Sequence, residues 1–181
     1  MDYVVKDGIL KSCHSKSALV TVPQDAVMIG SGAFESNKTV KKVIVPESVK
    51  SICGSAFENC TALETAVLPE GLEKLGGFAF VACKKLSCVN IPSSLTVIEE
   101  YTFAGCAFAE AVIPDGVKKI EKHAFFNCPK LNSVTLPPSL KEIADTAFLR
   151  CAAGITFRVQ KNPFAEEWVI SRFGEDAIRY S

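Results

Sequence analysis

The chain has 181 residues, 48% of them hydrophobic, and its 20 basic residues balance 20 acidic ones, which gives a formal net charge of zero. This length and hydrophobic content suit one domain with a continuous core. The balanced charge provides no net field toward nucleic acid or an anionic membrane, and no apolar run approaches the ~20 residues of a membrane span. We therefore expect neither a nucleic-acid partner nor a membrane span.

Residues 1–21 are predicted to form an N-terminal cap. Asp7-Gly8 lies between the apolar pairs Val4-Val5 and Ile9-Leu10, which is a strong signal for a β-hairpin. Such a hairpin would cover an open strand edge that otherwise invites aggregation. The first residues contain no basic segment followed by an apolar one, so they do not resemble a secretory signal peptide. This favours a cytoplasmic location, with the cell surface or secretion as the alternative.

Residues 22–158 contain six copies of a pattern of 22 or 23 residues. Each copy begins with an apolar residue followed by Pro, and a Phe follows eleven residues after that Pro. The six phenylalanines are Phe34, Phe57, Phe80, Phe103, Phe125 and Phe148. Self-similarity at this period is the sequence signature of a solenoid, in which stacked repeats share one core.

Within one repeat, two kinds of spacing predict two kinds of element. Val43 and Val45 alternate with outward residues before Pro46, which predicts a short strand that the proline ends. Ile52 and Ala56 then follow a spacing of four residues that continues to the cysteine slot, which predicts a short helix or 3₁₀ segment with one face on the core. The stacked strands would pair into a parallel sheet.

The fourth repeat is one residue shorter than the others. Cys83 precedes Pro92 by nine positions, whereas Cys106 precedes Pro114 by eight, and Phe108 takes a slot that holds leucine in neighbouring repeats. The deletion therefore falls in the turn after Cys106, where a loop is expected to absorb it.

Residues 45–67 read V-P-x-x-V-x-x-I-x-x-x-A-F-x-x-C-x-x-L-x-x-A-x, and this pattern resembles the BspA-like, or Treponema pallidum-type, leucine-rich repeats. The resemblance covers about residues 22–158, with Asn37 in place of Cys, Thr102 in place of Ala and Gly154 in place of Leu. It implies an α/β, right-handed leucine-rich-repeat solenoid with parallel short strands on one face and short helical segments on the other. Many proteins that share this pattern are exported to the cell surface.

Residues 159–181 are predicted to form a C-terminal helical cap. Asn162 is a helix N-cap followed by Pro163 at the first helical position, and Gly174 is a C-cap. Ile178 and the residues after it indicate a last short strand. Trp168 is interpreted as core of this cap and not as a ligand platform, because apolar residues at helical spacing usually pack inward.

The eight cysteines are interpreted as reduced, and five of them occupy one inward slot of the repeat: Cys60, Cys83, Cys106, Cys128 and Cys151. A free cysteine behaves as a small buried hydrophobe. The alternative, disulfides between coils, is disfavoured because the outer side of a curved solenoid spreads toward the ~7 Å Cα limit for a disulfide. The spacings match no zinc motif, so we expect no metal and no cofactor.

The outward positions of the strands are the candidate partner-binding residues. They are Lys42, Ile44, Thr65, Val67, Cys88, Asn90, Glu110, Val112, Ser133 and Thr135. Ile44, Val67 and Val112 share a slot and would form an apolar strip that Asn90 interrupts. The alternative is that these small aliphatic residues only serve strand propensity. Cys88 is the one thiol expected on this open face.

The sequence favours a non-catalytic, monomeric module that binds an unidentified protein partner through the sheet face. The alternative is an adhesion or host-contact protein on a bacterial surface whose export signal is missing from this chain. An enzyme ranks third, because no glycine-rich phosphate loop and no nucleophile elbow is present and no catalytic residue can be named.

Overall fold

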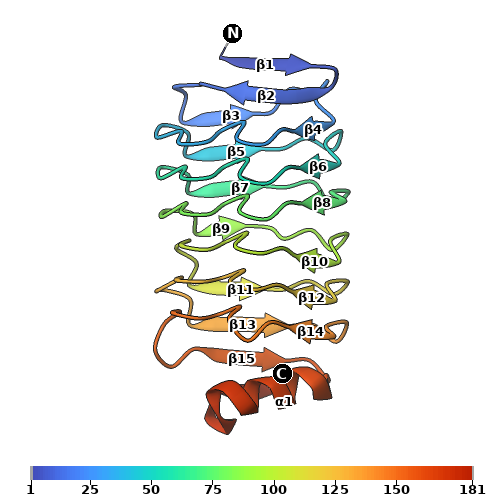
Figure 1. The fold of residues 1–181 in the computed structure, drawn as a ribbon, viewed down its shortest axis with the longest axis vertical. Coiled ribbons are helices and arrows are strands. Elements are labelled where there is room, and N and C mark those ends of the chain that lie inside the picture. The colour runs from blue at the N-terminus through green and yellow to red at the C-terminus, as the bar shows by residue number, and fades with distance from the viewer. Residues whose placement is uncertain (1, 181) are drawn as a thin grey trace.

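Stacked coils form the whole molecule, with a hairpin at one end and a helix at the other (Figure 1). The structure, a computed structural model, describes residues 2–180. Each coil crosses a front face, which carries the strands that precede the prolines, and a back face, which carries a second series of shorter strands. Along residues 2–180, no helix is both long and apolar enough to span a bilayer.

The front strands lie side by side in parallel, as the alternation of apolar residues predicts. They are β3 (Leu19–Thr21), β5 (Lys42–Ile44), β7 (Thr65–Val67), β9 (Cys88–Val89), β11 (Glu110–Val112), β13 (Ser133–Leu136) and β15 (Thr156–Val159). Pairing joins equivalent positions of successive coils, such as Val43 with Ala66. The predicted parallel sheet is confirmed, but it consists of two parts, β3-β5-β7-β9 and β11-β13-β15-β16.

The back face carries a second parallel ladder that the sequence pattern did not predict. Its strands are β4 (Met28–Ile29), β6 (Ser51–Ile52), β8 (Lys74–Leu75), β10 (Val97–Ile98), β12 (Lys119–Ile120) and β14 (Glu142–Ile143). These strands contain the slot of Ile52, so the prediction from spacing that this slot lies on a helix face is wrong. The back ladder is also interrupted, between β8 and β10.

The short helices predicted inside the repeats are absent from residues 2–158, and tight turns take their place. Ser55 and Asn59 have φ of 58° and 56°, and residues in this left-handed region cannot continue a right-handed helix. The main-chain N–H groups donate to the next coil instead: Phe57 N–H bonds to Ala79 O at 2.8 Å and Asn59 N–H to Val81 O at 2.8 Å. Bonds between coils therefore replace the bonds of a helix.

The interior is a column of aromatic rings and thiols. The rings of Phe34, Phe57 and Phe80 stack with centroids 4.6 and 4.9 Å apart. The same column continues through Phe103, Phe125 and Phe148. Beside it, each of the five thiols in the repeated cysteine slot donates to the carbonyl of a phenylalanine in the preceding coil, as Cys60 Sγ does to Phe34 O at 2.9 Å. The predicted core is confirmed.

The N-terminal end has the hairpin that Asp7-Gly8 predicts. Strands β1 (Tyr3–Lys6) and β2 (Ile9–Cys13) pair antiparallel, and β2 continues into the back ladder through β4. The hairpin thus extends the back face by main-chain hydrogen bonds.

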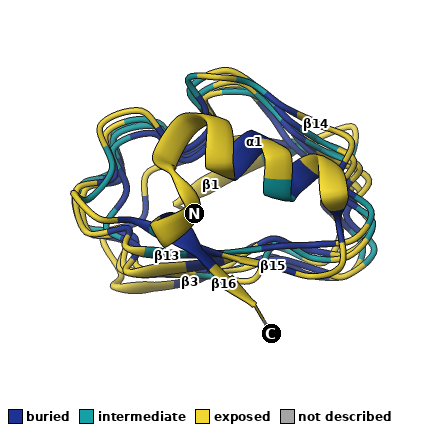
Figure 2. Cartoon of the chain, turned by 90° about the horizontal axis from the view of Figure 1, so that it is seen from below, coloured by how far each residue is buried: buried dark blue, intermediate teal, exposed yellow. Residues whose placement is uncertain are grey.

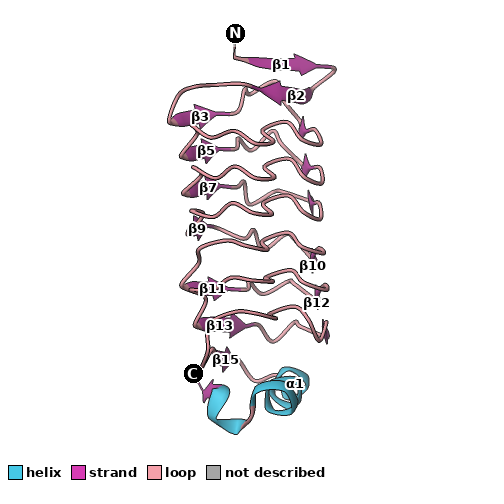
Figure 3. Cartoon of the chain, turned by 60° about the vertical axis from the view of Figure 1, so that its left-hand side comes forward, coloured by secondary structure: helices cyan, strands magenta, loops and turns pink. Residues whose placement is uncertain are grey.

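At the C-terminal end, α1 (Pro163–Phe173) lies across the open end of the last coil, as the view along the stack shows (Figure 2). The segment η1 (Glu175–Ala177) follows, and β16 (Ile178–Tyr180) pairs in parallel with β15 (Figure 3). Asn162 Oδ1 accepts from Ala165 N–H, so the predicted N-cap is confirmed. Trp168 is buried against Phe148 and Phe157, which confirms its place in the core of the cap.

Candidate functional site

All ten residues predicted for partner binding lie at outward positions of the front face. Six of them are exposed: Lys42, Val67, Cys88, Asn90, Glu110 and Val112. The other four are half-buried: Ile44, Thr65, Ser133 and Thr135. Between them along each strand, the inward neighbours Val43, Ala66 and Val134 are buried, which fixes the facing of the strands.

Strand pairing brings these residues together in two groups. In the first group Lys42 lies beside Thr65 and Thr65 beside Cys88, while Ile44 lies beside Val67. In the second group Glu110 lies beside Ser133 and Val112 beside Thr135. No strand pairing joins the groups, because β9 and β11 belong to different sheets.

The expected apolar strip is therefore divided. Ile44 and Val67 form one part, which ends at Thr21 on β3, whereas Leu19, 52% exposed, lies beside Lys42 in the other outward row of this face. Val112, 65% exposed, lies beyond the division. The sequence places Leu19 on the same face but not among the candidate binding residues. Its exposure in the structure adds it to them.

Asn90 has a structural role that its slot did not reveal. Its Oδ1 accepts from Leu68 N–H at 2.8 Å, and its Nδ2 donates to Leu68 O at 2.7 Å. In the two preceding coils a main-chain carbonyl makes the first of these bonds, as Val67 O does with Val45 N–H. The Asn90 carboxamide thus replaces a peptide group of the ladder, and β9 ends one residue earlier, at Val89.

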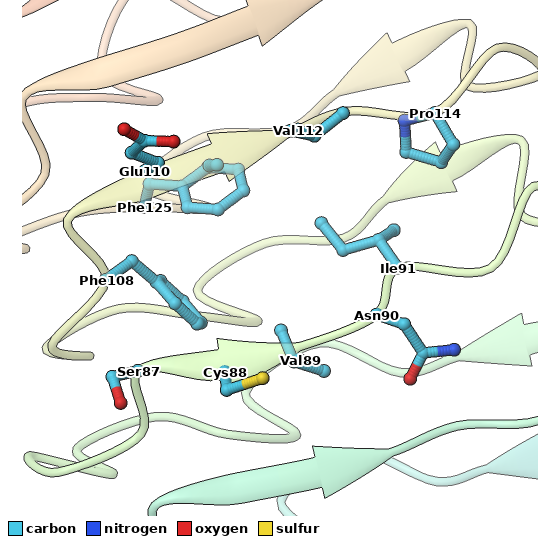
Figure 4. A pocket seen from close by; sticks show the side chains of 11 residues that line it. Ser87, Cys88, Val89, Asn90, Ile91, Phe108, Glu110, Val112, Pro114 and Phe125 are labelled. Atoms are coloured by element: carbon cyan, nitrogen blue, oxygen red, sulfur yellow. The ribbon is translucent and has the colours of Figure 1, made fainter.

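A cleft of about 350 Å³ opens in the front face where the sheet divides (Figure 4). Its floor includes the rings of Phe108 and Phe125, and Ile91 and Val112 form opposite sides. Ile91, Phe108 and Phe125 line the cleft but are not among the ten residues that the sequence predicts for partner binding. Two features of the sequence mark this place, the 22-residue repeat and the phenylalanine at a leucine slot. The prediction that a loop absorbs the deletion gave no reason to expect a cleft.

The thiols differ sharply in their surroundings. Cys88 is exposed at the cleft, whereas Cys106 is buried, and burial raises the pKa of the Cys106 thiol. All eight cysteines are free. Within residues 2–180 no group of three or more His, Cys, Asp or Glu side chains is arranged to hold a metal ion.

Comparison with known proteins identifies the repeat. The sequence model of the BspA-type leucine-rich repeat region matches residues 96–164. A search of curated proteins gave no match.

Among solved structures, the T. pallidum leucine-rich repeat protein is 23% identical over 99% of this chain and 94% of its own, with a TM-score of 0.69. A leucine-rich cell surface protein of Faecalibacterium prausnitzii is 20% identical over 88% of this chain and 52% of its own, with a TM-score of 0.66. A leucine-rich repeat protein of Bacteroides ovatus is 26% identical over 87% of this chain and 53% of its own, with a TM-score of 0.64. The chain thus spans about half the length of the last two proteins.

The matched segment contains the later repeats, and residues 22–95 carry the same markers and the same coil geometry. A BspA-type leucine-rich repeat region therefore occupies residues 96–164, and the described chain has the fold of leucine-rich repeat proteins.

Proposed function

We propose that the chain is a non-catalytic module that binds a partner protein through its front face. The observation that carries this proposal is an apolar patch on the front face, in which half-buried Ile44 lies beside exposed Val67 and exposed Leu19 lies in the neighbouring row of β3. A contiguous apolar patch on a sheet is typical of interaction surfaces. The broad sheet of a solenoid is also the kind of surface that repeat proteins use for binding.

The test is a double substitution in this patch, Ile44→Lys with Val67→Lys. Both side chains lie outside the core, so the variant is expected to keep its circular dichroism spectrum and to unfold within a few degrees of the wild type. Capture from a lysate of the native organism, with mass spectrometry of the bound protein, identifies the partner. Titration of that purified partner then measures the loss, which we expect to be at least about tenfold.

A matched control introduces the same charges elsewhere. Val27 and Leu149 are 51% and 48% exposed and lie outside the front strands, so Val27→Lys with Leu149→Lys changes the net charge equally. This control is expected to bind the partner as the wild type does. Equal losses in both double variants would contradict binding through the front face.

A second candidate function is contact with other cells from a bacterial surface. It is favoured by the likeness to the F. prausnitzii protein, which is a cell surface protein. The cytoplasmic location expected from the first residues gains no such support. Labelling of intact cells of the native organism with a membrane-impermeant biotin reagent tests the location. Labelling equal to that of a surface marker supports display, and labelling equal to that of a ribosomal protein rejects it.

A further inference from the structure

The division of the front sheet leaves two strand edges unpaired and facing each other. Elsewhere on this face an N–H of one coil bonds to a carbonyl of the next, as Val45 does to Val67 at 2.9 Å and Ile113 to Thr135 at 3.0 Å. Between residues 87–91 and 109–113, all of them described, no backbone hydrogen bond is present. The equivalent donor, Ile91 N–H, has no partner on β11.

The orientation of the free groups on β11 follows from its other edge. Ile113 N–H bonds to Thr135 O, on the side of β13. Successive residues of a strand point their N–H groups to opposite edges, so Val112 N–H points toward β9. The edge of β11 that faces β9 thus offers a row of N–H donors and carbonyl acceptors. Another strand can pair with such an edge.

The core is open at the same place. At the inward positions of the front strands, Val43, Ala66, Ala111 and Val134 are buried, whereas Val89 is half-buried. In the second inward column Ile91 is likewise half-buried, whereas Val45, Leu68 and Ile113 are buried. The cleft between β9 and β11 therefore gives access to apolar side chains that other coils seal.

Two local features lie at the division. Asn90 turns its carboxamide into the ladder toward β7, and β9 ends at Val89. Phe108 fills a leucine slot with a larger ring, which packs edge-on against Phe103 and Phe125 with centroids 5.7 and 6.5 Å apart. The turn that leads from Cys106 into β11 is one residue short.

We propose that this cleft binds an extended peptide segment of the partner protein, which adds as a strand to the free edges of β9 and β11. Main-chain groups of the peptide bond to the unpaired edges, and an aliphatic side chain enters the cleft above Phe108. A volume of about 350 Å³ lies at the small end of the range of ligand sites, so it suits one or two side chains. Glu110 is the one charged residue lining the cleft, which favours a basic residue beside the apolar anchor.

This inference rests on the proposed function and names the form of the partner at one place on the front face. The chain supplies a suitable probe in its own residues 40–46, Val-Lys-Lys-Val-Ile-Val-Pro, which include β5 of the intact protein. In the slot pattern of the sheet, Lys42 of an added strand occupies the same row as Glu110. The probe is this peptide, acetylated and amidated, with a fluorophore at its end.

The decisive variant is Val112→Pro, which removes the N–H that points into the cleft and leaves the bonds of β11 to β13 in place. Proline is tolerated on an edge strand. Fluorescence anisotropy is expected to show saturable binding by the wild type and binding weakened about tenfold by Val112→Pro. Val112→Ala keeps the N–H and is expected to change the affinity less than about threefold.

A test on the peptide does not depend on how the proline variant folds. N-methylation at alternate peptide nitrogens blocks one edge or the other, and methylation of at least one set is expected to abolish binding. Replacing both valines that flank the isoleucine with serine is also expected to abolish it. Bound peptide is expected to slow the reaction of Cys88 with a maleimide, because that thiol is exposed at the cleft.

Several outcomes overturn the inference: no binding by the wild type up to millimolar peptide, equal binding by Val112→Pro, or no protection of Cys88. Self-association of the wild type that Val112→Pro abolishes would identify a second copy as the occupant, which also overturns it. If the peptide fails while the Ile44→Lys, Val67→Lys variant still loses its partner, the inference fails and the proposed function stands. If the peptide binds but that double variant keeps its partner, the apolar patch is rejected instead.

Discussion

The middle of the aromatic column carries much of the stability of this fold. The side chain of Phe80 is fully buried between the stacked rings of Phe57 and Phe103. Deleting a buried aromatic side chain removes its transfer free energy and leaves a cavity. We predict that Phe80→Ala lowers the free energy of unfolding by about 3–5 kcal/mol, as measured by urea denaturation.

The control for this change is another phenylalanine two residues away. Phe78 is 40% exposed and stacks on Tyr101 at the surface, with centroids 4.9 Å apart. Phe78→Ala is expected to cost only about 1 kcal/mol, the value of an aromatic pair. A loss below 1 kcal/mol for Phe80→Ala would contradict the assignment of the column as the core.

The buried thiols predict a specific response to alkaline pH. Burial raises the pKa of Cys106 above its ordinary value of 9.0, so the folded chain keeps this thiol protonated at a pH where the unfolded chain ionises it. Its contribution to stability is therefore full below pH 9 and declines as the pH rises above 9. The decline for one such thiol is about 1.4 kcal/mol per pH unit.

Comparing the wild type with Cys106→Ala isolates this effect from the other groups that titrate in the same range. The difference in unfolding free energy between the two proteins is expected to be constant from pH 7 to 8. Above pH 9 the wild type is expected to lose stability that the variant keeps, so the difference changes in favour of the variant. A difference that stays constant to pH 10.5 would show that this thiol titrates alike in both states.

At the scale of elements, the turns explain which structure the sequence could predict. Strands and caps follow from local rules, namely alternation before a proline, Asp7-Gly8, and Asn162 before Pro163. The segment after each strand has helical spacing, yet Ser55 and Asn59 adopt left-handed conformations and donate across coils. The periodicity of apolar residues shows which side chains face inward. It does not show whether the main-chain hydrogen bonds stay within the segment or run to the next coil, so a turn and a short helix have the same sequence pattern.

The C-terminal cap is tethered by one side chain with two functions. Asn162 Nδ2 donates to Leu140 O at 2.8 Å and to Pro137 O at 3.1 Å, while its Oδ1 caps α1. On a free helix asparagine and aspartate cap equally well. Here a carboxylate would face carbonyl oxygens with nothing to donate.

We predict that Asn162→Asp destabilises the chain at pH 7 by about 2–3 kcal/mol, comparable to leaving buried acceptors unpaired, although it preserves the cap. Asn162→Ala, which loses cap and tether without adding charge, is the comparison. The loss in Asn162→Asp is expected to shrink near pH 4, where the carboxyl gains a proton that it can donate. Urea denaturation at both pH values measures this, and wild-type stability of Asn162→Asp at pH 7 would contradict the tether.

At the scale of the whole molecule, the solenoid and its facing could be read from the sequence, but the division of its sheet could not. The repeat shows which side chains share a column, and those columns are confirmed for the six phenylalanines. The one-residue deletion was visible, but its effect depends on how Phe108 packs and on where the Asn90 carboxamide points. Both are contacts between coils, and no periodicity encodes them.

Restoring the repeat tests the physical cause of the division. The repaired variant inserts one threonine after Cys106, as in the repeat that contains Cys60-Thr61, and replaces Phe108 with leucine. We predict that β9 and β11 then pair, because the turn regains its length and the larger ring of Phe108 is removed. Each new main-chain hydrogen bond contributes about 0.5–1.5 kcal/mol, so the unfolding midpoint should rise.

Hydrogen exchange measures the pairing directly. In the wild type the amides of Ile91 and Val112 are expected to exchange much faster than those of Val45 and Ile113, which bond to the next coil. In the repaired variant all four should be protected alike. The same insertion after Cys83, where the repeat already has 23 residues, is expected to destabilise the stack. A repaired chain that is less stable than the wild type, with Val112 still in fast exchange, would show that the short turn and Phe108 are not what separates the two strands.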